Sequence, residues 1–203
     1  MTTSIEKPAL TTPQTVQETA EREVAGARFS WRWVWIPLLI VLIFAGTYAL
    51  AWYNANQLTT RFVRDADASY AAGKYLDALV GYQKFDQQQN RYINYGGYLS
   101  VEKIWSNLYS WPQPAAVVRA KARTQEIVNQ RLTVQDAEQY IQVNTGKPAP
   151  YFAEIYLRLG ELYEQAGQTN DAKDVYQSMA HLFPNRPDLI KQAQAHLARL
   201  QGK

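Results

Sequence analysis

Few side chains in this sequence have the type and spacing that catalysis or metal binding requires. Thr145-Gly146-Lys147 is similar to the end of a phosphate-binding loop, but the upstream glycine is missing and a helical pattern, not a strand, precedes it. His181 and His196 are the only histidines, and no cysteine is present to complete a zinc site. Glu161 and Glu164 have the three-residue spacing of a solvated helix face. No Ser-His-Asp order stands out, so we expect no enzyme activity and no cofactor.

The composition of the chain argues against several further kinds of chemistry and binding. The chain has 203 residues and no cysteine, so it forms no disulfide and has no thiol nucleophile. Its net charge of +3 is too small to indicate nucleic-acid binding. We expect other proteins as partners, with no nucleic acid and no small-molecule substrate.

One stretch is far more apolar than the rest. Residues 33–53, WVWIPLLIVLIFAGTYALAWY, contain 21 residues and no charge. A helix of this length spans about 31 Å, close to the hydrocarbon thickness of a bilayer. Tryptophans and tyrosines lie at both ends, as at the two lipid–water boundaries. We therefore expect a transmembrane helix at residues 31–53 and contact with the lipid bilayer.

Two alternatives to a retained anchor remain open. A buried core helix is disfavoured because nothing polar interrupts the run. A cleaved signal peptide is conceivable because Ala49-Leu50-Ala51 has the pattern of a cleavage site. The apolar run is, however, longer than that of most signals, and a long leader with several acids precedes it.

The charges that flank the span predict its orientation. Arg28 and Arg32 come directly before it, whereas Arg61 on the other side is soon offset by Asp65 and Asp67. By the positive-inside rule, the N-terminus is cytoplasmic and the C-terminal domain lies on the outer or periplasmic side of the plasma (inner) membrane. A wider window balances the positive charges, so the opposite topology stays open.

Outside the span, the pattern predicts a disordered tail at residues 1–30 and helices throughout 54–203. Apolar spacing is helical, good helix formers dominate, and we expect no strand. Helix breaks are expected at Gly73, residues 95–98, residues 111–114, residues 146–150, Gly167 and Pro184.

A short phrase, Asp-Ala-x-x-x-(Tyr/Ile)-Gln, occurs three times, beginning at Asp77, Asp136 and Asp171. Each aspartate suits the first turn of a helix, where a carboxylate meets the positive end of the helix dipole. The small alanine that follows allows a neighbouring helix to approach closely. The larger residue four positions later lies on the same face. Each copy therefore predicts the second helix of a packed pair.

The last copy resembles the tetratricopeptide repeat family. The matching residues are Tyr156, Leu159, Gly160 and Tyr163, followed by Ala172, Tyr176 and Pro184. The resemblance implies a short tetratricopeptide-like solenoid. Together with the apolar run, it predicts an all-α chain: one N-terminal transmembrane helix followed by this solenoid. Its helical hairpins would span residues 57–90, 116–150 and 151–185, with residues 187–200 as a C-terminal capping helix. The first two hairpins match the pattern only weakly.

The resemblance also predicts a binding groove. In tetratricopeptide domains the first helices line the concave side, which would here be a mixed-charge groove for a peptide or a helical segment. Its residues would be Arg64, Asp67, Arg119, Arg123, Glu126, Arg158, Glu161 and Glu164. The alternative is that these are ordinary solvent-facing charges.

Residues 90–114 do not fit the repeat and are rich in aromatics. The aromatic insert contains Tyr92, Tyr95, Tyr98, Trp105, Tyr109 and Trp111. Such density is typical of the core of a protein interface. Two alternatives are ordinary packing, with a helix at residues 100–109, and contact with the headgroup layer near the anchor.

These features together predict a non-catalytic, single-pass membrane scaffold that binds partner proteins at the membrane surface. The alternative is a permanent accessory subunit of a membrane complex, such as an electron-transfer or transport assembly. The aromatic insert favours the subunit, and the charged groove favours the scaffold.

Overall fold

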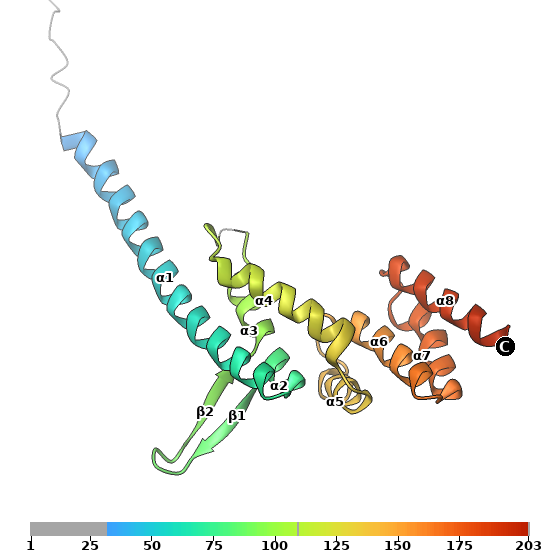
Figure 1. Cartoon of the computed structure of the whole chain (residues 1–203). Coiled ribbons are helices and arrows are strands. Elements are labelled where there is room, and N and C mark those ends of the chain that lie inside the picture. Colours follow the sequence, from blue (N-terminus) through green and yellow to red (C-terminus); the bar gives the residue numbers. More distant parts are fainter. Residues whose placement is uncertain (1–31, 109, 203) are drawn as a thin grey trace, which may run out of the picture. The chain divides into compact units, whose positions relative to one another are not determined.

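The structure, a computed structural model, describes residues 32–108 and 110–202. The predicted tail at residues 1–30 and Tyr109 of the aromatic insert lie outside the described residues. The part described is mostly helical, with one small sheet (Figure 1). In chain order its elements are α1 (Arg32–Ala71), α2 (Tyr75–Val80), β1 (Gly81–Asp86), β2 (Arg91–Gly96), α3 (Tyr98–Ile104), α4 (Ala115–Glu126), a π-helical turn η1 (Ile127–Arg131), α5 (Val134–Asn144), α6 (Phe152–Gln165), α7 (Thr169–Leu182) and α8 (Pro187–Gln201).

Helix α1 contains the predicted span and continues well beyond it. Of the helices described, it is the one long and apolar enough to cross a membrane. The predicted boundary between residues 53 and 54 is not a helix break, because no proline or glycine follows until Gly73. The chain divides into two compact units between Tyr48 and Ala49, within this helix.

In the second unit, one face of α1 belongs to the core. Trp52 and Ala55 pack against it, Thr59 and Val63 are buried, and Ala66 is fully enclosed. Steps of three and four residues place these side chains on one stripe of the helix. The domain therefore begins to pack against α1 within the last turn of the apolar run.

The prediction that the chain has no strand is wrong. Strands β1 and β2 form an antiparallel hairpin that extends away from the helices, with Gly81 opposite Gly96 and Asp86 opposite Arg91 (Figure 1). The helix of the first repeated phrase ends at Val80 because Gly81 has φ +80°, a conformation that favours glycine. The predicted hairpin at residues 57–90 is thus reduced to the end of α1 and a six-residue α2.

The next helices differ from their predicted bounds. Helix α3 spans Tyr98–Ile104 where residues 100–109 were expected, and it packs against α2 and α4. Helix α4 begins directly after Pro114 and passes into the π-helical turn. Helix α5 packs mainly against α6, so residues 116–150 do not form a simple two-helix hairpin.

The C-terminal part follows the predicted boundaries closely. Helix α6 packs against α7, α7 packs against α8, and Gly167 turns between the first two with φ +76°. The predicted final helix is confirmed as α8, with Pro187 in its first turn. Its Leu189 and Ala193 complete a second apolar cluster with α6 and α7.

The repeated phrase is confirmed as a helix-start signal. All three aspartates lie in first turns, and Asp136 forms a capping box with Thr133. All three alanines are fully buried: Ala78, Ala137 and Ala172. The larger residues four positions after these alanines do not share one environment. Tyr176 is buried, Ile141 is half-buried and Tyr82 lies on β1.

Candidate functional site

The first part of the predicted groove is a network of paired side chains between α1 and α4. Arg119 Nη2 lies 3.5 Å from Asp67 Oδ2, and the Tyr98 hydroxyl donates to Asp67 Oδ1 at 2.5 Å. Burial and the hydrogen bond to Asp67 raise the pKa of Tyr98. Asp67 therefore connects the two helices with α3. Arg64, one turn before it, is exposed.

Glu126 at the end of α4 is the centre of a second network. It accepts from the Tyr70 hydroxyl at 2.5 Å, from Arg123 Nη1 at 2.7 Å and from Arg131 Nη2 at 3.0 Å. These three hydrogen bonds, with Tyr70 contributing most, hold the pKa of Glu126 at about 2, below its ordinary 4.5. The Arg123 guanidinium also lies 4.5 Å from the centre of the Tyr70 ring.

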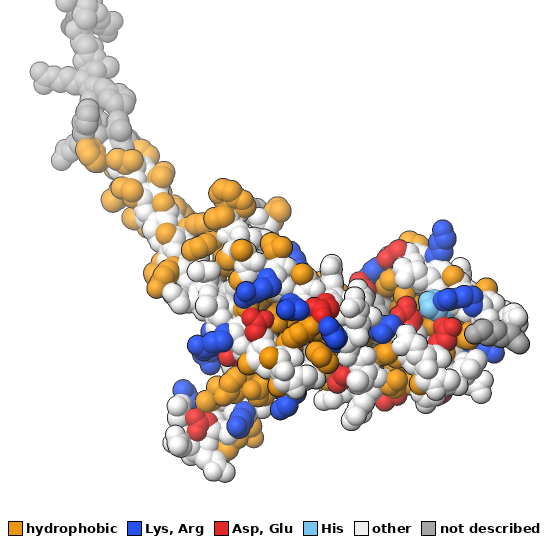
Figure 2. All heavy atoms as spheres, viewed as in Figure 1, with side chains coloured by type: hydrophobic (Ala, Val, Ile, Leu, Met, Phe, Trp, Pro, Cys, Tyr) orange, Lys and Arg blue, Asp and Glu red, His pale blue; other side chains and the backbone are white. Residues whose placement is uncertain are grey.

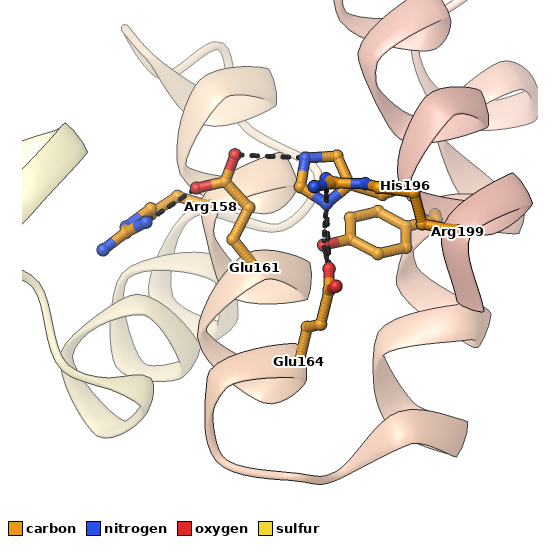
Figure 3. Close-up of polar contacts among 6 residues, drawn as sticks. Arg158, Glu161, Glu164, His196 and Arg199 are labelled. Atoms are coloured by element: carbon orange, nitrogen blue, oxygen red, sulfur yellow. Dashed lines mark hydrogen bonds and ion pairs between the residues drawn. The ribbon is translucent and has the colours of Figure 1, made fainter. Parts of the chain in front are cut away.

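The third network connects α6 with α8 (Figure 3). Arg158 Nη1 donates to Glu161 Oε2 at 2.7 Å, and Glu161 Oε1 lies 3.7 Å from His196 Nε2. His196 Nδ1 lies 2.8 Å from Glu164 Oε2 and 2.7 Å from Arg199 Nη2. One ring nitrogen cannot serve both partners at once. When protonated it donates to Glu164, and when deprotonated it accepts from Arg199.

Glu164 is further stabilised as a carboxylate. Hydrogen bonding to His196 and to the Tyr176 hydroxyl, which donates at 3.1 Å, lowers the pKa of Glu164. Because Tyr176 lies on α7, this one carboxylate connects α6, α7 and α8. The network therefore supports the packing of the last three helices.

Most charges of the predicted groove consequently neutralise one another within the chain. Figure 2 shows basic and acidic side chains intermixed on this face of the helical domain. Each of these carboxylates already accepts from donors within the chain, which leaves fewer of its lone pairs for a ligand. The arrangement agrees better with ordinary structural charges than with an open peptide groove.

The aromatic insert divides into buried and exposed members. Tyr98 and Trp105 are buried in the core, so they are not available to a partner in this conformation. On the hairpin, Tyr95 stacks on Tyr82 with 4.7 Å between ring centres. Tyr92, nearer the turn, is 68% exposed, so the hairpin presents an aromatic side chain to solvent.

A cavity of about 590 Å³ lies among α3, α4, α5 and the turn after α5, and the sequence did not indicate it. Its lining is Val80, Leu99, Ser100, Glu102, Lys103, Trp105, Ser106, Lys121, Tyr140, Asn144, Pro148 and Pro150. Half of these residues are apolar or aromatic and half are polar or charged, so the cavity offers both apolar surface and hydrogen-bonding groups to a ligand. No short motif joins these residues, since they come from four separate segments.

Glu102 gives this cavity its polar feature. Its Oε2 accepts from the Tyr151 hydroxyl at 2.9 Å, while its Oε1 is buried with no hydrogen-bond partner among the described residues. A buried acceptor without a partner costs about 1–3 kcal/mol, so a side-chain rearrangement that brings this oxygen to a donor in the cavity would be favoured. Lys103 and Lys121 add positive charge to the same lining.

No group of three or more His, Asp or Glu that could hold a metal ion occurs in residues 32–108 and 110–202. The cavity can instead bind a segment that combines an apolar side chain with a hydrogen-bond donor. Comparisons of the chain with protein-family models, with curated proteins and with solved structures found no match.

Proposed function

We propose that this protein is a non-catalytic, single-pass membrane scaffold whose helical domain binds a segment of a partner protein. The apolar run in α1 supports the membrane anchor. Arg28 and Arg32 before the run support a cytoplasmic N-terminus, with the helical domain on the outer face of the plasma membrane.

Packing between α6 and α7 supports a tetratricopeptide-like repeat at residues 151–185. Gly160 lies directly against Tyr176 and Val175 of α7, where a larger residue would not fit. The Tyr156 hydroxyl lies 3.1 Å from Ser178 Oγ, and Ala172 is fully buried. These contacts occur at the positions that carry the resemblance in the sequence. Such repeats commonly serve protein binding, although fold alone does not establish function.

The unpartnered Oε1 of Glu102 is the observation that carries the proposal. Glu102 itself lines the cavity, together with apolar and aromatic residues and two lysines, Lys103 and Lys121. A peptide segment fits this lining if it offers an N–H to Glu102, an apolar side chain to Leu99 and the prolines, and an acidic group to the lysines.

A permanent subunit of a membrane complex is the second candidate, and the hairpin favours it. A two-stranded sheet leaves both outer edges unpaired, and an isolated hairpin is marginally stable in water. Exposed Phe85 and Tyr92 lie 5.1 Å apart near its turn, as an interface anchor would. A neighbouring subunit that covers this hairpin would satisfy its edges.

Purification of the full-length tagged chain from its own membranes in mild detergent tests both candidates. The scaffold predicts substoichiometric partners that Lys121→Glu reduces and that the control Lys191→Glu, at an exposed position of α8, leaves unchanged. The subunit predicts a fixed one-to-one set of membrane proteins that Tyr92→Ser weakens. A chain that purifies alone contradicts both candidates.

The predicted groove is tested separately through Arg64, which is exposed. Arg123 and Arg158 are less suitable, because each already pairs with a glutamate and its reversal would disturb the packing. If Arg64→Glu loses the partners and Lys121→Glu retains them, the partners bind at the groove and not at the cavity.

A further inference from the structure

The connection between α3 and α4 is unusual in having no charge. From Ile104 to Val118 the sequence contains no Asp, Glu, Lys or Arg, although charged residues are frequent elsewhere in the domain. We call the described part of this region, residues 104–108 and 110–118, the uncharged loop.

Several apolar side chains of the uncharged loop are directed to the outside. Leu108 is 90% exposed, Trp111 is 76% exposed, and Val118 in the first turn of α4 is also exposed. Figure 2 shows hydrophobic side chains gathered over this connection. Apolar side chains that gather on an exposed surface in this way are typical of an interaction site.

The uncharged loop is fastened to α1 at Trp52. The Trp52 indole Nε1 donates to the carbonyl of Pro112 at 2.9 Å, and its ring contacts Trp105 edge-on with centres 6.0 Å apart. Trp105 in turn donates from Nε1 to the buried Thr59 hydroxyl at 2.6 Å. Gln113 Nε2 donates to the Trp105 carbonyl at 3.2 Å and closes the loop on itself. These hydrogen bonds hold the uncharged loop beside Trp52, at a defined position along the axis of α1.

This position on α1 is the C-terminal end of the apolar run. Trp52 lies in its last turn, and the next charge along α1 is Arg61, nine residues later. At about 1.5 Å per residue, Arg61 is roughly 14 Å further along the helix. No charged side chain of α1 near Trp52 would therefore have to leave water if this part of the helix contacts lipid. Tryptophan at the end of a span marks the headgroup layer, where its indole N–H finds a polar partner. Here that partner is Pro112 of the loop.

We propose that the uncharged loop is a second membrane contact, which inserts Leu108 and Trp111 into the headgroup boundary beside α1. This inference rests on the proposed membrane span. The partner is the bilayer itself, because the loop offers apolar and aromatic groups without charge, the composition of an interfacial anchor. The contact would therefore restrict how the helical domain tilts on its anchor.

The absence of cysteine allows a direct test with single cysteines. The full-length Leu108→Cys chain, labelled with an environment-sensitive fluorophore, is reconstituted in phosphatidylcholine vesicles that contain nitroxide lipids at shallow or deep positions. Leu42→Cys, in the middle of the apolar run, reports whether the span is inserted. Val143→Cys, an exposed apolar position on α5, is the aqueous control.

We expect shallow nitroxides to quench the Leu108 label several-fold more than the Val143 label, and iodide to quench it less. A Leu108 label as open to iodide as Val143, with Leu42 quenched by deep nitroxides, overturns the loop contact and leaves the anchor intact. Protection from iodide without quenching by lipid means that protein covers the loop, and it overturns the lipid assignment. If no lipid quenches Leu42 either, the proposed span fails and the loop contact fails with it.

Discussion

Replacement of Gly160 by alanine tests the close packing of α6 on α7. A Cβ at this position would lie 2.6 Å from Tyr176 Cε1 and 3.0 Å from Val175 Cγ1. Real Cβ atoms do not approach other atoms so closely, and Tyr176 is held by its hydrogen bond to Glu164. One of the two helices must therefore shift.

Two opposing effects determine how much Gly160→Ala changes the free energy of unfolding. Overpacking of a filled core costs about 1–3 kcal/mol. Alanine in a helix interior is better than glycine by about 1 kcal/mol, which offsets part of that cost. We expect the free energy of unfolding to fall by about 1 kcal/mol, which corresponds to a melting temperature lower by roughly 3 °C for a domain of this size.

The assay is urea unfolding of the full-length chain in mild detergent, followed by near-ultraviolet circular dichroism. That signal reports the packing of aromatic rings rather than the micelle-bound part of α1. The reverse change at an exposed site, Ala195→Gly on α8, is the control and should cost about 1 kcal/mol through propensity alone. If Gly160→Ala instead stabilises the chain by the full propensity gain, the close approach of α6 and α7 is refuted.

Two more predictions concern single polar groups. The buried Thr124 hydroxyl has no hydrogen-bond partner among the described residues, so Thr124→Val should raise the free energy of unfolding by about 1 kcal/mol, whereas Thr60→Val on the exposed face of α1 should change it little. A loss of stability in Thr124→Val would show that the hydroxyl has a partner after all. For Glu126, the folded pKa of about 2 lies below the ordinary 4.5, so its stabilisation is complete above pH 4.5 and is lost as the pH falls towards 2. The urea midpoint should therefore fall more steeply between pH 5 and about pH 3 in the parent chain than in Glu126→Gln, and equal slopes would contradict the pairing of this carboxylate.

Signals that act within a few residues were sufficient to predict much of the helical part. Gly167 and Pro184 end helices because of their own backbone limits, and Asp136 lies in the first turn of a helix, as the repeated phrase predicts. The uncharged run in α1 predicts an apolar helix from composition alone.

The hairpin could not be predicted in this way. Residues 81–96 contain tyrosines and glutamines that fit either a helix or a strand, and short segments of this kind are ambiguous by periodicity. Pairing of β1 with β2 depends on Gly81 and Gly96 lying opposite each other against the rest of the domain. Tyr82, expected to fill a helix interface, consequently stacks on Tyr95.

The candidate site also combines features that depend on neighbouring residues with features that depend on distant segments. The charged residues predicted for the groove lie on α1, α4 and α6. Whether they face a ligand or one another depends on partners far away in the sequence, such as Tyr70 for Glu126 and Tyr98 for Asp67. The cavity around Glu102 and the bond from Trp52 to Pro112 join segments separated by tens of residues. Helix limits follow from local backbone chemistry, whereas burial, pairing and cavities arise only when distant segments exclude water from one another.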